Sequence, residues 1–501
     1  MTPAGFQHRL NEARQLLLGQ HFTQALLRYV KLTRAFPGQA VVWFEYGTTA
    51  ARLGRLEGAS RAWERAMQLE PRNAELIVQI GHQYQGLRKP EQARACFARA
   101  AADFKAINPR ISLAVLLEQQ HRLDEAQAAV EECLAIDPRD DQARYLSAVL
   151  DRRENQLEAA ESRLRQLIQS DPKHPYVRYA CRYELAQILD RTGRFDEAMK
   201  MLAEAKQFVR ALTDTEVLLK NYDQAAESAR QFALSQPKNM LRAWAKSFPA
   251  QEREVTPPLA FLGGHPRSGT TLLEQVLGAH PGVAALDEPL AFAEVLQPAF
   301  CTTQEHSSAQ LNVLRRLYTR ALMDEVGAAG NGKLLLDKNP SLTAQLPVWL
   351  REFPELRVVI ALRDPRDVVL SCYFQNILLN ATNVNFLSLE RLAKHYADLM
   401  DIWLAVREWE GFAWLETRYE DIVADLEQEG QRVTGFLGLD WNEEQNRFHE
   451  KSRQKQLYSP TYQDVIRPVY ASSVGRWRAY EKHLAPILPA LEPYCRSLSY
   501  G

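Results

Sequence analysis

The first 205 residues repeat small side chains at a helical spacing. Six sets of residues recur at offsets of 0, 12 and 19, with alanine or glycine at the first two positions of every set and at the third position of three sets, and successive sets lie 33 to 38 residues apart. Gly47, Ala59 and Ala66 form one such set, and Pro37 and Pro71 mark helix ends at the same period. Antiparallel helices can cross closely only where side chains are small, so the pattern predicts an all-α solenoid of paired helices.

Residues 206–255 keep a helical pattern but lose the repeat, and the proline-containing run 255–258 follows them. From residue 259 onward, short apolar runs alternate with helix-like segments. This alternation predicts an α/β domain with a mainly parallel sheet. We expect strands at residues 259–264, 334–336, 357–362 and 412–415. The predicted organisation is a solenoid over residues 1–205, a linking helical segment over 206–255 and an α/β domain over 256–501.

Basic residues follow the first three of these apolar runs. Arg267, Lys338 and Arg363 stand at or just beyond the predicted strand ends. Ligands of open parallel sheets bind beyond the carboxyl ends of the strands. The sequence therefore predicts a convergent positive cluster at that edge of the sheet.

A phosphate-binding loop is predicted between the first strand and the helix after it. The segment from Gly264 to Thr271 has the Gly-x-x-x-x-Gly spacing, but Thr270 stands where nucleotide triphosphatases carry lysine. The backbone N–H groups at the helix start still favour an anion, and Arg267 supplies a positive charge. A loop that holds a 5′-phosphate without a triphosphate tail fits this pattern, and a P-loop kinase is the rival interpretation.

The composition favours a folded soluble protein, with 46% hydrophobic and 25% charged residues. The formal net charge of −1 gives no indication of nucleic-acid binding. The N-terminal residues lack the pattern of a signal peptide, and no window approaches the ~18 consecutive apolar residues of a membrane span. The six cysteines are scattered and indicate neither a zinc site nor a disulfide framework, so we expect a cytoplasmic protein without a metal.

The repeat resembles the tetratricopeptide repeat, a helix–turn–helix unit. Solenoids of this kind present extended concave surfaces, so the resemblance implies a groove that holds a peptide or partner protein. The alternative is a solenoid that only supports the following domain.

The second half resembles sulfotransferases. Residues 266–272 resemble their 5′-phosphosulfate loop, and Arg363 with Ser371 resembles their 3′-phosphate element. Residues 461–470, with Arg476 after them, resemble the cofactor-covering segment of tyrosylprotein sulfotransferases. The resemblance covers about residues 256–480, and its combination with the repeats resembles bacterial repeat-containing sulfotransferases.

The resemblance implies 3′-phosphoadenosine 5′-phosphosulfate (PAPS) as co-substrate. The loop would hold the 5′-phosphosulfate, Arg363 and Ser371 the 3′-phosphate, and Tyr419 the nucleotide. The implied cofactor-binding residues are Arg267, Ser268, Gly269, Thr270, Thr271, Arg363, Ser371, Tyr419, Thr461, Arg467 and Arg476.

The same resemblance implies Glu288 as the catalytic base and Lys338 as the catalytic lysine. A carboxylate can take the proton of an acceptor hydroxyl, while Lys338 and Arg267 stabilise the charge on the leaving oxygen. Gln375 departs from the family, which carries a second arginine near the 3′-phosphate. The acceptor stays open: a polypeptide hydroxyl such as tyrosine, a sugar or a small molecule. A non-catalytic repeat scaffold with a relic transferase domain is the second rival.

Overall fold

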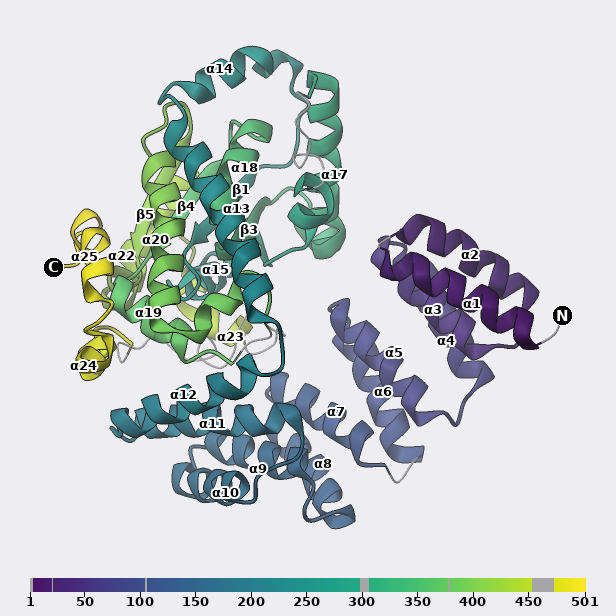
Figure 1. Cartoon of the computed structure of the whole chain (residues 1–501). Coiled ribbons are helices and arrows are strands. Elements are labelled where there is room, and N and C mark those ends of the chain that lie inside the picture. The colour runs from purple at the N-terminus through teal and green to yellow at the C-terminus, as the bar shows by residue number, and fades with distance from the viewer. Residues whose placement is uncertain (1–2, 20, 104–105, 298–305, 377–378, 453–472) are drawn as a thin grey trace. The chain divides into compact units, whose positions relative to one another are not determined.

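The computed structural model describes residues 3–19, 21–103, 106–297, 306–376, 379–452 and 473–501 (Figure 1). The chain divides into two compact units, Met1–Val177 and Arg178–Gly501. The first unit is helical, and the second contains a parallel sheet. The predicted fold class, an N-terminal helical repeat region with a C-terminal α/β domain, is confirmed.

The helices of the repeat region pair at the predicted small residues. Ala59, Ala66 and Ala93 are fully buried. A Cβ added at Gly47 would lie 2.6 Å from Trp63, and one at Gly81 would lie 2.4 Å from Phe97. The glycines are therefore required by the close approach of neighbouring helices. The helices are α1 (Pro3–Leu18), α2 (Phe22–Ala35), α3 (Ala40–Arg52), α4 (Leu56–Leu69), α5 (Ala74–Gly86), α6 (Pro90–Asp103), α7 (Ile107–Gln119), α8 (Leu123–Ile136), α9 (Asp141–Arg153), α10 (Leu157–Gln169), α11 (Pro175–Arg191) and α12 (Phe195–Arg210).

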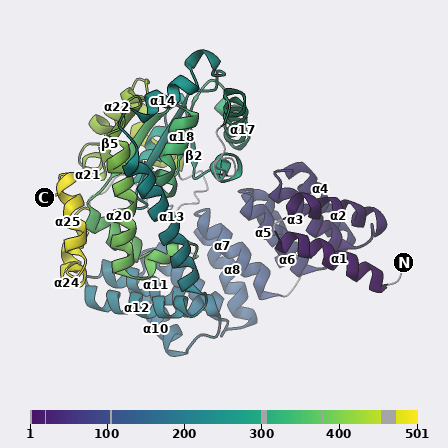
Figure 2. The same ribbon diagram turned by 45° about the horizontal axis from the view of Figure 1, so that its top comes forward.

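Helix α12 and most of α11 belong to the second unit, together with α13 (Thr215–Ser235) and α14 (Met240–Ser247). Helix α13 lies alongside α20 (Leu389–Val406) in both ribbon views (Figure 2). Arg230 of α13 donates a hydrogen bond of 2.8 Å to Asp401 of α20. The segment before the sheet is thus joined to the α/β domain by specific polar contacts.

Among the described residues, the sheet has five parallel strands in the order β2-β3-β1-β4-β5. Leu262 pairs with Lys338, and Gly264 pairs with Ala361, so the carboxyl ends of β3, β1 and β4 lie side by side. Four of the strands were predicted, and β2 was not. The strands are β1 (Leu259–Gly264), β2 (Val283–Asp287), β3 (Leu334–Lys338), β4 (Arg357–Leu362) and β5 (Ala413–Arg418).

Apolar side chains fill both faces of the sheet. On one face Leu262 packs in a cluster with Leu273 of α15 and Val433 of α22. On the other face the ring of Phe261 lies 4.5 Å from that of Trp349. Covering a parallel sheet on both faces leaves its carboxyl edge as the natural place for a site. The remaining helices are α15 (Thr270–Gly278), α17 (Ser308–Val326), α18 (Leu346–Glu352), α19 (Pro365–Tyr373), α21 (Tyr419–Ala424), α22 (Leu426–Phe436), α23 (Phe448–Ser452), α24 (Glu481–Leu484) and α25 (Leu488–Ser497).

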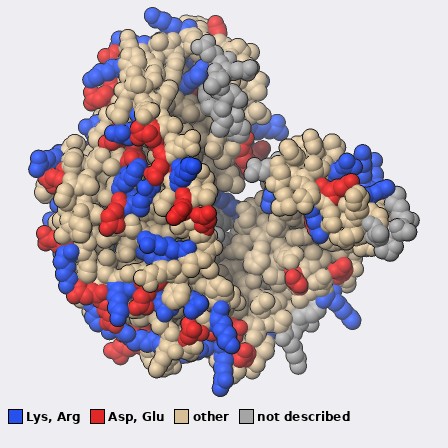
Figure 3. All heavy atoms as spheres, in the orientation of Figure 1, with Lys and Arg blue, Asp and Glu red and all other residues tan. Residues whose placement is uncertain are grey.

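Charged side chains of both signs are interspersed on the face of the molecule shown in Figure 3. This mixture agrees with the net charge of −1. Within the described ranges, we find no helix with the length and apolar character needed to cross a bilayer.

Candidate active site

The loop between β1 and α15 has a backbone that only glycine suits at two positions. Gly264 has φ of 128°, and an added Cβ would lie 2.3 Å from the carbonyl oxygen of Ala361. Gly269 has φ of 88° and is the N-cap of α15, and an added Cβ would lie 2.6 Å from Cδ2 of Tyr419. A close backbone approach and a left-handed conformation therefore shape the loop before the helix begins.

The loop presents buried hydroxyls and helix N–H groups at the start of α15. Ser268, Thr270 and Thr271 are all buried. Thr270 and Thr271 are the first two residues of α15, where the backbone N–H groups point out of the N-terminal end of the helix. These donors and the helix dipole favour a bound anion at this point.

Arg267 joins the loop to helix α19. Its φ of 75° is in the left-handed region, which is rare for a side chain of this size. Its Nε atom donates a hydrogen bond of 3.0 Å to the hydroxyl of Ser371. The residues predicted to contact the 5′-phosphosulfate and the 3′-phosphate are therefore in direct contact with each other.

Arg363 follows β4 and is 7% exposed. Its Nη1 atom donates to the carbonyl oxygen of Arg267 at 3.2 Å, and its guanidinium lies 4.7 Å from the ring centre of Tyr419. Its Nε atom is buried and has no hydrogen-bond partner among the described residues. A buried charged donor is costly without an acceptor, so this atom is suited to donate to a bound acceptor such as a phosphate oxygen.

Lys338 ends β3 and is fully buried. Its ammonium group donates to Asp287, and it donates to Oε1 of Glu288 at 3.1 Å. Burial alone would lower the pKa of Lys338, but the charges of Asp287, Glu288 and Glu274 outweigh it, so the pKa lies above its ordinary value. Lys338 is therefore a charged residue at neutral pH.

Glu288 lies just beyond the end of β2 with φ of 53°. Its N–H donates to the carbonyl oxygen of Lys338 at 2.8 Å, which fixes the turn against β3. The side chain of Glu288 is 41% exposed, whereas that of Asp287 is 11% exposed. Of the two carboxylates on Lys338, Glu288 is the one that an external molecule can reach more easily.

The predicted residues come together at the carboxyl ends of all five strands. Glu288 follows β2, Lys338 ends β3, Arg267 follows β1, Arg363 follows β4 and Tyr419 follows β5. Thr461 and Arg467 lie outside the described residues. Arg476 is among the described residues and contacts Asp190 and Phe374.

The side chain of Gln375 bonds to the backbone of α19. Its side-chain amide donates to the backbone carbonyl of Ser371 at 3.1 Å, one turn back along α19. The residue at the position of the family's second arginine is thus bonded to its own helix segment.

Two parts of the chain match models of known protein families. Residues 258–443 match the model of the sulfotransferase family, and residues 10–74, 117–181 and 154–213 match tetratricopeptide repeat models. The chain carries a sulfotransferase-family domain and tetratricopeptide repeats.

Several curated proteins are similar to this chain. A chicken protein named protein-tyrosine sulfotransferase 2 is 25% identical over 49% of this chain and 72% of its own length. Protein-tyrosine sulfotransferase A of Caenorhabditis elegans is 24% identical over 49% of this chain and 68% of its own length. An uncharacterised protein of Aquifex aeolicus is 25% identical over 63% of this chain, which spans 41% of that protein's length.

Solved structures also show local similarity. The sulfotransferase domain of the Synechococcus olefin synthase has a TM-score of 0.32 and 18% identity, over 45% of this chain and 88% of that one. YrrB, described as a repeat protein with an unusual peptide-binding site, has a TM-score of 0.28 and 17% identity, over 36% and 91%.

The sulfotransferase domain contains further polar residues that the sequence did not single out. Asp287 shares Lys338 with Glu288, and the Asp-Glu doublet after an apolar run was the signal available for it. His265, inside the loop, is fully buried, and its Nε2 atom lies 2.7 Å from Nδ1 of His395 in α20. Burial lowers the pKa of His265 to about 4, so the pair supports the loop in its neutral form.

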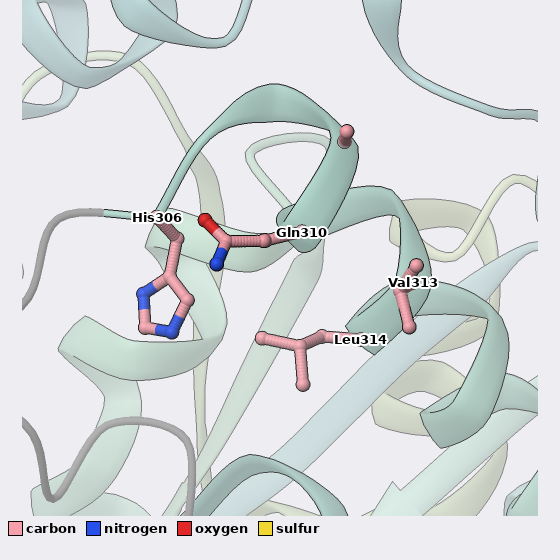
Figure 4. Close-up of a pocket in the computed structure, with 5 residues that line it drawn as sticks. His306, Gln310, Val313 and Leu314 are labelled. Atoms are coloured by element: carbon pink, nitrogen blue, oxygen red, sulfur yellow. The ribbon is translucent and has the colours of Figure 1, made fainter.

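A hollow in the sulfotransferase domain lies beside the start of α17 (Figure 4). It is lined by His306, Ala309, Gln310, Val313 and Leu314. None of the residues discussed above is among these lining residues, so the hollow is separate from the cluster at the strand ends.

Proposed function

We propose that the protein is a PAPS-dependent sulfotransferase that transfers a sulfuryl group to a hydroxyl of a polypeptide. One observation carries the proposal: the buried cations Lys338 and Arg363 and the accessible carboxylate Glu288 gather around a glycine-shaped loop at one edge of the sheet. The sulfotransferase family match covers this whole cluster.

The residues present fit the donor. The start of α15 and Arg267 suit the 5′-phosphosulfate, because they combine N–H groups, hydroxyls and a positive charge. The buried Nε of Arg363, which lacks a partner among the described residues, and the hydroxyl of Ser371 suit the 3′-phosphate. When bound, PAPS supplies an activated sulfuryl group on a phosphate leaving group.

The residues around Lys338 suit the transfer step. Glu288 takes the proton of the acceptor hydroxyl, whose oxygen forms the new bond to sulfur as the bond between sulfur and the phosphate oxygen breaks. Lys338 remains charged and stabilises the negative charge that develops on that phosphate oxygen. The products are a sulfate ester and adenosine 3′,5′-bisphosphate.

A P-loop kinase is disfavoured by the loop itself. Thr270 is a buried helix residue where a kinase of that type carries the lysine that reaches the β- and γ-phosphates. Arg363 and Ser371, which both contact Arg267 of the loop, add contacts for a second phosphate group beside the loop. We therefore propose specificity for a nucleotide with phosphates at both the 5′ and 3′ positions.

A polypeptide tyrosine is the acceptor we propose to test first. The relatives named protein-tyrosine sulfotransferases match about half of this chain. The tetratricopeptide repeats suit the capture of a peptide, because solenoids present extended binding surfaces.

The test is turnover with PAPS and a library of tyrosine-containing peptides, read by mass spectrometry for the addition of one sulfate group. We expect sulfated peptide from the wild type and from Glu294→Gln, a control acidic residue on the following segment, but not from Glu288→Gln. The midpoint temperature of thermal unfolding should rise when adenosine 3′,5′-bisphosphate is added and should change little when ATP is added. Equal stabilisation by both nucleotides, with no transfer to any hydroxyl, would overturn the proposal.

A further inference from the structure

The C-terminal segment of residues 473–477, which carries Arg476, crosses one face of helix α19. The backbone N–H groups of Gly475 and Trp477 each donate to the carboxylate of Asp367 at 2.7 Å. Arg363 donates to the carbonyl oxygen of Ser473 at the beginning of the same segment. Asp367 stands four residues before Ser371, so both lie on one face of the helix. The segment is therefore anchored to α19 one helical turn before Ser371, the residue predicted to bind the 3′-phosphate.

The side chain of Arg476 is held from a different part of the chain. Its Nε and Nη2 atoms lie 3.1 Å and 3.0 Å from the two carboxylate oxygens of Asp190, which belongs to α11. The hydroxyl of Tyr480 donates to the same carboxylate at 2.7 Å. The guanidinium lies 4.3 Å from the ring centre of Phe374, three residues after Ser371.

These contacts fix both the place and the plane of the guanidinium. A bidentate arginine–carboxylate pair is directional, unlike a single charge–charge contact. The two side chains are 23% and 19% exposed, so solvent screens the pair less than a surface ion pair. Arg476 thus has a defined orientation beside the end of α19 that carries Ser371.

We propose that Asp190 is a positioning residue of the nucleotide site: by holding Arg476, it sets the recognition of the 3′-phosphate. The inference rests on the proposed PAPS-dependent function. Gln375 is uncharged and bonded to its own helix segment, whereas Arg476 lies against Phe374 at the same end of α19, so we assign Arg476 as the cation on this side of the 3′-phosphate. The residue that orients this cation lies in the last pair of repeat-type helices, 286 residues away in sequence.

A purely structural role for Asp190 makes a different prediction. If Asp190 only fastened the C-terminal segment, its substitution would change the affinities for all nucleotides equally or would change none of them. The neighbouring helix provides a comparison: Asp196 of α12 pairs with Lys482 and His483 and is 66% exposed. It joins the same two regions of the chain without touching Arg476.

The experiment measures two affinities by titration calorimetry, for adenosine 3′,5′-bisphosphate and for adenosine 5′-monophosphate, with the full-length protein. We expect Asp190→Asn to lower the affinity for the bisphosphate about tenfold, because a charge-assisted contact to the 3′-phosphate is lost. The affinity for the monophosphate should stay unchanged. Asp196→Asn should leave both affinities unchanged. In an Arg476→Ala background, Asp190→Asn should have no further effect.

The outcomes separate the inference from the function on which it rests. A wild type that does not prefer the bisphosphate would overturn the proposed function itself. A wild type that prefers it, with Asp190→Asn equal to the wild type or weakened equally for both nucleotides, would overturn the positioning role alone. If Asp190→Asn does not fold, Arg476→Gln replaces it, and an unchanged affinity ratio in that variant would refute the inference.

Discussion

Replacing Gly269 with alanine tests the phosphate loop at its most constrained point. The residue has φ of 88°, so a side chain there meets the left-handed penalty of about 1–2 kcal/mol. In addition, the new Cβ would lie 2.6 Å from Cδ2 of Tyr419. Tyr419 must move, and Arg363, whose guanidinium lies 4.7 Å from that ring, loses its support. We expect a loss of stability above the strain penalty and nucleotide binding weakened at least about tenfold.

Two other glycines separate strain from contact. Gly332 has φ of 72° and nothing within 4 Å of an added Cβ, so Gly332→Ala carries the strain alone. Gly435 lies in α22 with no positive φ and nothing within 4 Å, so Gly435→Ala should stabilise the protein by about 0.5–1 kcal/mol. Neither substitution should change nucleotide affinity.

The assays are urea unfolding for stability and titration calorimetry with adenosine 3′,5′-bisphosphate for binding. The difference in unfolding free energy between Gly269→Ala and Gly332→Ala isolates the contact with Tyr419. If Gly269→Ala binds the nucleotide as tightly as Gly332→Ala does, the loop is not its binding site and the reasoning is refuted.

Three further substitutions test separate parts of the site. Glu288→Gln should keep the affinity for the bisphosphate but lower turnover about 10²–10⁴-fold; a parallel fall in calorimetric affinity would make the residue structural. Arg363→Ala should weaken the bisphosphate about tenfold to hundredfold while the protein stays folded, and unchanged affinity would contradict the 3′-phosphate role. Burial raises the pKa of Asp337 to about 7, so its protonated form is favoured in the folded state and stability falls as pH rises from about 4 to 7. Asp337→Asn should remove that fall from urea unfolding measured at several pH values, and an unchanged pH profile would show that Asp337 does not cause it.

Local patterns in the sequence predicted much of the fold. The alanines at the helix crossings are buried because the spacing of small side chains follows directly from helix pairing. Strands β1 and β4 were predicted because each is a short apolar run in the sequence. Both runs are buried in the sheet. Strand β2 was missed because two of its five residues are alanines, which are depleted in strands, whereas β3 begins with three leucines that form a clear apolar run.

Part of the site followed from sequence because strand ends carry local signals. Arg267, Lys338 and Arg363 each stand at or beyond a predicted strand, and parallel topology brings them to one edge. The pairing of Lys338 with Asp287 depends on the order of strands in the sheet, which no local pattern gives. The contact of Asp190 with Arg476 depends on tertiary packing across 286 residues, so sequence spacing could not predict it.

The last repeat-type helices, α11 and α12, follow the helical repeat pattern and also make buried polar contacts with the sulfotransferase domain. Lys206 of α12 is 2% exposed and donates to the carbonyl oxygen of Phe386 at 2.7 Å, with its ammonium 4.1 Å from the ring centre of Tyr373. Burial lowers its pKa to about 7, and beside it Arg210 donates to the carbonyl oxygen of Leu387 at 2.9 Å. A buried lysine is costly unless its donors are satisfied, and these partners belong to the sulfotransferase domain.

Removing residues up to 205 would remove Asp190, the partner of Arg476, and would make Lys206 the first residue of the shortened chain. A truncation before α11 would keep both Asp190 and the helix that carries Lys206. The helical repeat pattern therefore continues into a region whose buried polar contacts serve the sulfotransferase domain, and a truncation that separates repeats from catalysis must respect those contacts rather than the repeat period.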